Sequence, residues 1–316
     1  MAFILKRAAI AAASILAVSI AVFALQSFSY GDSSYSVLAE DASREDIERY
    51  LSAKGLDRPL WERYPAFIAS FFSGDWGETI GGRDIREIIR HRLPVTVSIS
   101  LLSLAMASLL SFALVYASFL CRKPFFGKAL EGIVYVLSAL PSYLIALLLV
   151  LAFSLWKGIF PVAGYVPPSY GIIGHLRSIF LPSLTLALMH SSHFIRMMLL
   201  SVRENLGSDH VLGSRSLMLR DSAIILKEGF RPSLVLFISL LWQSVGTLAA
   251  GSAVVETVFA LPGLGSLFVD AALKRDAQLS SVIVMLIAIA VSLSGLLSAL
   301  CEMAADPRLR RSRQDE

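Results

Sequence analysis

Six long apolar runs constrain this chain more than any other feature of its sequence. They cover residues 8–28, 95–120, 130–155, 179–200, 234–259 and 281–301. A helix needs about twenty apolar residues to cross the hydrocarbon core of a bilayer. Only 16% of the residues are charged, whereas a soluble globular chain is about a quarter charged. The sequence therefore predicts an all-α integral membrane protein with six transmembrane helices.

The first run, residues 8–28, follows Lys6 and Arg7 and resembles a secretory signal peptide. Its apolar core is longer than the roughly 7–15 residues of such a signal, and further spans follow it. We therefore expect it to stay in place as the first transmembrane helix.

Residues 29–94 form the sizeable polar region, and we predict an extracytoplasmic domain there. Residues 43–51 begin with a capping-box pattern and predict a helix. The glycines in 74–77 and 81–82 predict turns. Segment 84–92 places Ile85, Ile88 and Ile89 on one side, which suits a helix on the membrane surface. The same pattern suits a helix packed on the outer domain.

The third and fifth runs contain residues that weaken helices. Pro141 lies in the middle of 130–155, and Gly246 and Gly251 lie in 234–259. Such residues are tolerated in a membrane helix where neighbouring helices satisfy the freed backbone groups. They therefore indicate a packed bundle.

Basic residues in the short flanks predict the orientation, because cytoplasmic loops carry an excess of Lys and Arg. The predicted outer side has only Lys157, Arg177, Lys274 and Arg275 in its short loops. The other side carries fifteen: Lys6, Arg7, Arg122, Lys123, Lys128, Arg196, Arg203, Arg215, Arg220, Lys227, Arg231, Arg308, Arg310, Arg311 and Arg313. We predict cytoplasmic termini, with a first helix in 1–28, the outer domain in 29–94, a five-helix core in 95–303 and a tail in 304–316.

A polar, charge-mixed insert at 204–236 separates the fourth and fifth runs. Two short helices fit it, with Ser208 or Asp209 and then Asp221 or Ser222 as N-cap candidates. The first predicted helix would carry an apolar stripe of Val211, Leu212, Met218 and Leu219. Such a face could dock into a groove on a soluble partner. An ordinary cytoplasmic connection would also fit.

Several polar residues within the spans are candidates for a translocation pathway. His190 and His193 share a helix face, but a His pair without a carboxylate or Cys is weak support for a metal, and we predict no metal site. Glu256, near one end of its span, would either line the pathway or brace the turn that follows. The complete candidate set is Ser138, Pro141, Ser142, His190, His193, Gln243, Ser244 and Glu256.

Several motifs resemble those of ABC-transporter permeases, most closely the dipeptide/oligopeptide/nickel branch. The insert at 204–236 resembles the EAA loop of that family. The longest match is Val255-Glu256-Thr257-Val258-Phe259-Ala260-Leu261-Pro262-Gly263-Leu264-Gly265. Shorter matches are Ser29-Tyr30-Gly31-Asp32, Gly55-Leu56-Asp57-Arg58-Pro59, Gly74-Asp75-Trp76-Gly77, Arg92-Leu93-Pro94-Val95-Thr96 and Asp306-Pro307-Arg308.

The resemblance implies a permease subunit of a binding-protein-dependent importer in a bacterial inner membrane, most often one for peptides. Such a subunit pairs with a second permease, identical or different, and with cytoplasmic ATPases, while a binding protein delivers substrate outside. The chain itself would bind no cofactor and no nucleic acid, because ATP is used by a partner. The implied coupling residues are Asp209, Val211, Leu212, Gly213, Arg215, Met218 and Leu219, and the implied outer turn contains Pro262, Gly263 and Gly265.

The insert departs from the family pattern in its details. Where the family usually has Glu, Ala-Arg-Ala and Gly, this chain has Asp209, Ser214-Arg215-Ser216 and Met218. Arg215 keeps its place and Asp209 keeps the charge, whereas Met218 lacks the conformational freedom of glycine. Pro232 also falls earlier than the proline that ends the family's loop.

Two other function classes fit an apolar bundle. A channel or ion-coupled carrier would work without an ATPase, but it predicts charged residues in mid-span, which these runs nearly lack. A membrane scaffold with a receptor-like outer domain would leave the insert without a use. The 316 residues contain no Gly-x-x-x-x-Gly-Lys-Ser/Thr phosphate loop, so an ATPase would have to be a separate chain.

Overall fold

The computed structural model describes residues 2–37, 59–121, 124–208, 211 and 220–305. Within these residues the chain is helical apart from turns and one antiparallel bridge between Glu78 and Asp84. Five helical stretches are long and apolar enough to cross a membrane: Leu5–Ser27, Ile85–Leu120, Ile172–Leu206, Asp221–Gly251 and Ala277–Met303. A bent pair brings the number to six if it counts as one span. The predicted all-α membrane fold is confirmed.

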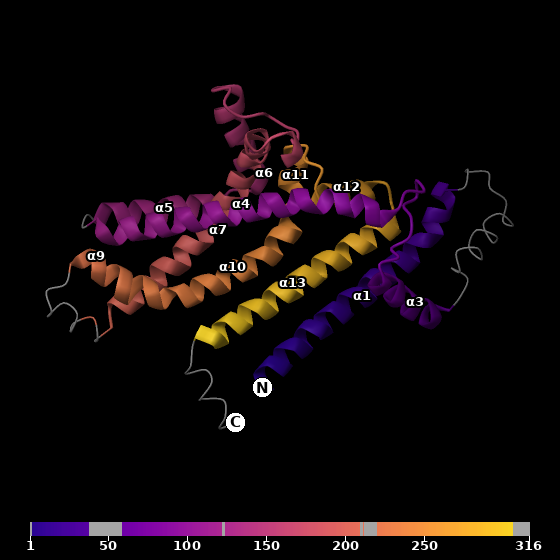
Figure 1. Cartoon of the computed structure of the whole chain (residues 1–316), viewed down its shortest axis with the longest axis horizontal. Coiled ribbons are helices and arrows are strands. Elements are labelled where there is room, and N and C mark those ends of the chain that lie inside the picture. The colour runs from indigo at the N-terminus through magenta and orange to yellow at the C-terminus, as the bar shows by residue number, and fades with distance from the viewer. Residues whose placement is uncertain (1, 38–58, 122–123, 209–210, 212–219, 306–316) are drawn as a thin grey trace.

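The spans pack side by side in a layered bundle (Figure 1). Helix α4 (Ile85–Leu120) packs along α7 (Ile172–Leu206), and α10 (Arg231–Gly251) packs along α13 (Ala277–Ala305). Helix α1 (Ala2–Val37) lies on α13 at the edge of the bundle. The start of α1, the end of α13 and the end of α7 lie toward the lower left of Figure 1, whereas α3 (Leu60–Ser73) and α12 (Leu264–Leu273) lie toward the right.

The third predicted span is not continuous. Helix α5 (Pro124–Ala139) ends before Pro141, and α6 (Ser142–Leu149) begins after it and continues as π-helix η1 (Val150–Leu155). The two halves, Phe125–Ala139 and Ser142–Trp156, are bent by 108°. Pro141 has no N–H to donate and its ring disfavours helical geometry in the residue before it. The continuous helix predicted for 130–155 is therefore wrong.

The fifth predicted span is also divided. Helix α10 ends at Gly251, and the separate short helix α11 (Ala253–Val258) follows, so the single helix predicted for 234–259 is wrong at its outer end. Gly265 of α12 packs so closely on α11 that a Cβ atom there would lie 2.5 Å from the Cα atom of Ala253. This close packing holds α11 against α12 rather than in line with α10.

Segment 84–92 is the first part of α4 and not a separate surface helix. Asp84 caps α4 by accepting a hydrogen bond from the Arg86 amide at 2.8 Å, and the helix continues past Pro94. Ile85 and Ile89 are buried in a cluster with residues of α12 and α13. Neither reading of this segment holds as stated, because the helix packs mainly on α12 and α13 of the core rather than on the membrane surface or on the outer domain alone.

The predicted turns before α4 are confirmed. Gly74 ends α3 in a left-handed conformation (φ 80°), and Gly77 is also left-handed (φ 73°). A hairpin turn follows, with Gly82 at φ 68° and hydrogen bonds between Thr79 and both Arg83 and Gly82. These three glycines therefore stand where other residues would be strained. Asp276 accepts the Ile80 amide at 3.0 Å and holds this hairpin against the start of α13.

Small side chains allow the two main helix pairs to approach closely. Along α4, residues 99, 103, 107, 111 and 115 repeat every fourth position and are fully buried: Ile99, Ser103, Ala107, Ser111 and Val115. From α7, the Ser183 hydroxyl donates to the Ile99 carbonyl at 3.2 Å. Small residues and interhelical hydrogen bonds of this kind stabilise helix pairs in membranes.

Gly246 provides the close approach between α10 and α13. A Cβ atom at this position would lie 2.5 Å from Ser294 Oγ and 3.0 Å from the Val291 Cα atom. We predict that Gly246→Ala forces the two helices apart and destabilises the protein by about 1–3 kcal/mol, which is the usual cost of overpacking. The thermal unfolding midpoint in one detergent measures the effect.

Gly295→Ala is the matched control for that substitution. Gly295 lies in α13, where nothing stands within 4 Å of an added Cβ atom. The control should unfold at or above the temperature of the unchanged protein. Equal midpoints for the two variants would contradict the close approach at Gly246.

Candidate functional site

The structure describes the predicted coupling insert in part, mainly at its two ends, where it joins the helices on either side. Of its predicted residues, Val211 is described and is buried, with 1% of its surface exposed. The other coupling residues of the prediction, Asp209, Leu212, Gly213, Arg215, Met218 and Leu219, lie outside the described residues. The base itself consists of the end of α7 and the start of the helix that follows the insert.

Hydrogen bonds from Asn205 clamp the two sides of this base together. The Asn205 side-chain amide donates to the Gly229 carbonyl at 3.2 Å and to Ser233 Oγ at 3.0 Å. The hydroxyls of Ser201 and Ser233 lie 2.8 Å apart. A Cβ atom on Gly229 would come within 2.9 Å of Val202 Cγ1. We call Ser201, Asn205, Gly229 and Ser233 the loop clamp.

The helix after the insert differs from the prediction of a short, separate helix. It begins at Asp221, with Arg220 at the capping position, so neither Asp221 nor Ser222 is the N-cap. Helix α9 (Asp221–Ile224) continues through π-helix η3 (Ile225–Phe230) directly into α10. Pro232 follows this π-helical turn and lies at the start of α10. Proline has no backbone N–H to donate, and a π-helical turn is a local change in the helical hydrogen-bond pattern that can accommodate such a residue.

Polar residues of α7 and α10 meet at the surface of the single chain. His190 Nδ1 lies 2.9 Å from the Leu186 carbonyl, and its Nε2 lies 3.3 Å from Thr247 Oγ1. Gln243 and Thr247, one helical turn apart on α10, are exposed, whereas Ser244 is buried. We call His190, Gln243 and Thr247 the polar face. An exposed polar face on membrane helices normally meets water or another helix, not lipid.

The other pathway candidates are spread around this region. The Ser138 hydroxyl on α5 donates to Ser192 of α7 at 3.2 Å. Ser142 begins α6 next to the exposed Pro141. His193 is half-buried beside Phe194. Among the described residues, no three His, Cys, Asp or Glu side chains come together in a way that could hold a metal ion.

Glu256 lies in α11 and is fully buried. Its Oε1 accepts hydrogen bonds from Thr96 Oγ1 at 2.7 Å and from Ser252 Oγ at 2.9 Å, and its Oε2 accepts the Ser266 amide at 2.8 Å. Every partner is a donor, which suits a carboxylate because an ionised carboxylate only accepts. The side chain faces Thr96, Ser252 and Ser266 rather than the polar face.

This network supplies hydrogen-bond partners for the beginning of α12. The first backbone N–H groups of a helix have no partner within the helix. At α12 the Leu264 amide donates to Thr96 Oγ1 at 2.8 Å, and the Ser266 amide donates to Glu256. A negative charge at a helix N-terminus also interacts favourably with the helix dipole. Thr96 and Glu256 therefore join α4, α11 and α12 at one point.

The predicted outer turn is built around this network. A Cβ atom on Gly263 would lie 2.3 Å from the Glu256 carboxylate, so no larger residue fits. Pro262 is partly buried, and Ala260, just before it, has a left-handed backbone (φ 48°). Together with the contact of Gly265 on α11, these positions give a physical reason for both glycines of the motif.

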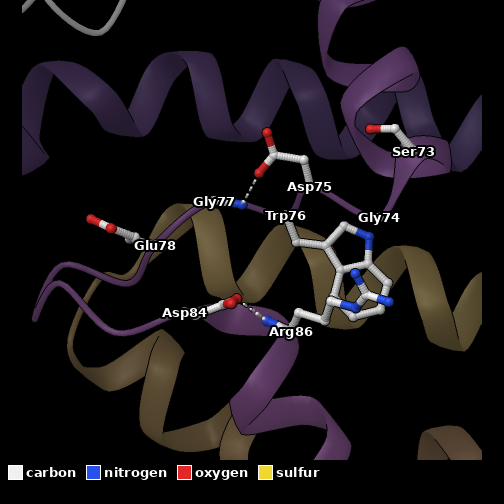
Figure 2. Close-up of a pocket in the computed structure, with 8 residues that line it drawn as sticks. All are labelled: Ser73, Gly74, Asp75, Trp76, Gly77, Glu78, Asp84 and Arg86. Atoms are coloured by element: carbon white, nitrogen blue, oxygen red, sulfur yellow. Dashed lines mark hydrogen bonds between the residues drawn. The ribbon is translucent and has the colours of Figure 1, made fainter.

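A separate open hollow of about 640 Å³ lies at the same end of the bundle. Figure 2 shows Asp75, Glu78 and Asp84, from the segment between α3 and α4, and Arg86, from the start of α4, around it. Two of these carboxylates stabilise backbone: Asp84 caps α4, and Asp75 accepts the Gly77 amide at 3.4 Å. None of the predicted site residues lines this hollow.

Sequence reasoning missed the partners in each of these groups. Thr247, Ser252 and Ser266 are ordinary polar residues: Thr247 is 57 residues from His190 in the chain, whereas Ser252 and Ser266 are four and ten residues from Glu256 and carry no signal of their own. Asn205 and Ser233 lie near the two ends of the 204–236 insert and are 28 residues apart in the chain. Of these partners, the sequence indicated only Thr96, which is the last residue of the Arg92–Thr96 motif.

The sequence of this chain is similar to the sequences of known membrane transport proteins. Residues 110–311 match the family described as binding-protein-dependent transport system inner membrane component. A Brucella abortus protein named for a peptide transport system permease is 31% identical over 98% of this chain and 99% of its own length. The oligopeptide transport system permease protein AppB of Bacillus subtilis is 26% identical over 98% of this chain and 99% of its own. The dipeptide transport system permease protein DppB of Lactococcus lactis is 26% identical over 84% and 86%.

The Glu256 network leads to a prediction about stability. We expect Glu256→Ala to lower the free energy of unfolding by about 3 kcal/mol, because three buried donors lose their acceptor. Glu256→Gln should also destabilise, by about 2 kcal/mol, because its NH₂ group must face either the Ser266 N–H or the two hydroxyls. Thermal unfolding of both variants in one detergent measures these effects.

Thr257→Ala serves as the control for the Glu256 variants. Thr257 is exposed on the same short helix, and its hydroxyl donates within that helix to the Ala253 carbonyl at 2.8 Å. This change should leave the unfolding midpoint nearly unchanged. A Gln variant as stable as the unchanged protein would contradict the acceptor-only role of Glu256.

Proposed function

Because the chain belongs to the family of binding-protein-dependent transport system inner membrane components, we propose that it forms half of the pathway of an ATP-driven peptide importer. Members of this family are membrane transport components rather than enzymes, and we assign no catalysis to this chain. The peptide substrate is proposed from the names of the relatives, which include oligopeptide and dipeptide transport.

The loop clamp is the observation that carries the coupling proposal. Asn205 and Ser233 hold the end of α7 against the start of α10, so the insert between them emerges from a closed base. A force on the insert would therefore move both helices together. We propose that the insert docks on a cytoplasmic ATPase and that ATP binding and hydrolysis drive alternating access through this base.

The arrangement of helix ends supports the proposed orientation. The start of α1, the end of α13 and both sides of the loop clamp lie at one end of the bundle (Figure 1). The sequence places most short-loop Lys and Arg residues at this end, which the positive-inside rule assigns to the cytoplasm. The Glu256 network and α3 then lie at the extracytoplasmic end, where a substrate-binding protein would dock.

The polar face is the proposed surface of the translocation pathway. His190, Gln243 and Thr247 would meet water or the second permease subunit, identical or different, rather than lipid. Ser138, Ser142, His193 and Ser244 lie on the four helices α5, α6, α7 and α10, and with Pro141, between α5 and α6, they complete the proposed set. Glu256 is instead assigned to bracing the outer turn, because all its hydrogen bonds are internal.

The coupling proposal is tested with Asp209→Ala plus Arg215→Ala in the full complex, purified through this chain. We expect an ATPase to co-purify with the unchanged chain and to be lost, or no longer stimulated by the binding protein, in the double variant. Uptake of a labelled tripeptide into proteoliposomes should fall at least tenfold. Uptake of labelled nickel ion, measured in a separate assay, tests whether the substrate is a metal ion instead of a peptide.

Asp270→Ala plus Lys274→Ala is the matched control, because it removes the same pair of charges from exposed positions at the other end of the bundle. It should retain the co-purified ATPase and its hydrolysis, because both positions lie away from the proposed ATPase dock. If no nucleotide-binding chain co-purifies with the unchanged protein under mild extraction, the importer proposal fails and a carrier without an ATPase takes its place.

The variant Asn205→Ala distinguishes docking of the ATPase on the insert from transmission of its motion to the two helices. It should keep the co-purified ATPase and its hydrolysis, because Asn205 lies at the base of the insert, where its side chain bonds Gly229 and Ser233, and this variant leaves Asp209 and Arg215 unchanged. Tripeptide uptake per ATP hydrolysed should fall severalfold as the two helices lose their connection. Unchanged uptake per ATP would show that the clamp does not transmit the motion.

Cysteine accessibility tests the polar face. After Cys121 and Cys301 are replaced by serine, single cysteines at Gln243 and Thr247 should react with a membrane-impermeant thiol reagent in the assembled complex. A cysteine at Ile238, which is 42% exposed on another side of α10, should stay unreactive in lipid. Reaction at 238 with none at 243 and 247 would contradict the pathway assignment.

A further inference from the structure

Helix α3 has two apolar surfaces, and the protein covers one of them. Tyr64, Phe67 and Phe71 point toward the bundle: Tyr64 and Phe67 lie 5.4 Å and 5.8 Å from the Phe23 ring of α1, and Phe71 is buried. At 100° per residue, Trp61, Pro65, Ile68 and Phe72 fall on a neighbouring face. Trp61 is 76% exposed and Phe72 is 69% exposed. We call these four residues the α3 outer stripe.

The remaining part of the circumference of α3 is polar. Glu62, Arg63, Ser70 and Ser73 fall within about a third of the helical wheel, opposite the outer stripe, and Arg63 at the edge of this arc places its guanidinium 5.8 Å from the centre of the Phe23 ring of α1. The apolar arc thus continues from the covered face onto the open face, and the polar arc is narrow. This distribution is typical of a helix that lies in a membrane interface.

The contacts of α1 place this stripe at membrane depth. Gln26 of α1 donates to the side chain of Gln278, the second residue of α13, so Gln26 is level with the outer end of that span. The Tyr64 hydroxyl lies 2.7 Å from Ser19 Oγ, and Ser19 precedes Gln26 by seven residues, toward the N-terminal end of α1. At 1.5 Å per residue this is about 10 Å below the level of Gln26. Interfacial helices bury their apolar face about 5–10 Å into the boundary of headgroups and acyl chains.

The direction of α3 agrees with this depth. In Figure 1, α3 lies across the axis of α1 instead of running along it, as a helix in the membrane plane would. Helix α1 also exposes apolar side chains at this level, since Ile20 is 50% exposed and Leu25 is 71% exposed. Within a span, such apolar side chains face lipid. Tryptophan is enriched at this level of membrane proteins.

We propose that α3 is an interfacial anchor whose outer stripe, Trp61, Pro65, Ile68 and Phe72, contacts phospholipid at the headgroup–acyl boundary. Through Tyr64 and Phe71, lipid contact would then fix the position of the turn after α3 and the start of α4. This inference depends on the chain spanning a membrane and is independent of its substrate and its ATPase.

Site-specific photocrosslinking in the full complex tests the proposal. A benzoylphenylalanine replaces Trp61 or Phe72, and the complex is placed in nanodiscs of phosphatidylethanolamine and phosphatidylglycerol. Irradiation should attach phospholipid to this chain at both positions, which mass spectrometry detects. Ala66, an exposed residue on the polar side of α3, is the control position and should give at least fivefold less lipid adduct.

Two results would overturn the proposal. Crosslinks from positions 61 and 72 into another subunit would show that a partner covers the outer stripe. Equal lipid adducts at positions 61, 66 and 72, or none, would show that α3 does not lie in the interface. The two positions are tested separately, so failure of one variant to assemble leaves the other to decide.

Discussion

Hydrogen bonding of helix ends is the constraint on which this bundle depends. In the hydrocarbon core no water is present to satisfy a free N–H or C=O group, so every interruption of a membrane helix needs a partner from elsewhere. At the break before α12, that partner comes from Thr96 and Glu256, which belong to two other helices. The outer turn, both of its glycines and the position of α11 all follow from the need to satisfy these few backbone groups.

Small residues let the helices pack closely together. Close packing is needed because apolar side chains gain little free energy by exchanging contacts with lipid for contacts with one another. The α4–α7 contact uses Ser103, Ala107 and Ser111, and the α10–α13 contact uses Gly246. These contacts set the distances between spans. The clamp and the Glu256 network then connect the spans at opposite ends of the bundle, so each end has its own fixed point.

The sequence predicted the number and approximate positions of the spans, because hydrophobic length is a local property that the bilayer makes decisive. It failed where the outcome depended on tertiary contacts: Pro141 breaks a span instead of being tolerated, and residues 221–230 continue into α10 instead of forming a short helix. Among the candidate site residues, the sequence singled out His190 and Glu256, because placing polar or charged side chains inside a membrane costs free energy. It could not find Asn205, Thr247 or Ser266, because ordinary polar residues acquire their roles only from partners distant in the chain.

The closed base of the insert has a consequence for how such a protein can vary. Asn205 and Gly229 bring the two ends of the intervening segment together by their own hydrogen bond, so the bundle does not depend on that segment for closure. The entropic cost of a longer connection grows slowly once its ends are held. Substitutions such as Met218 in place of glycine can therefore accumulate between the two ends at little cost to the spans. If the insert docks on an ATPase as proposed, an element attached in this way is modular, and it can change to suit a new ATPase while the spans stay the same.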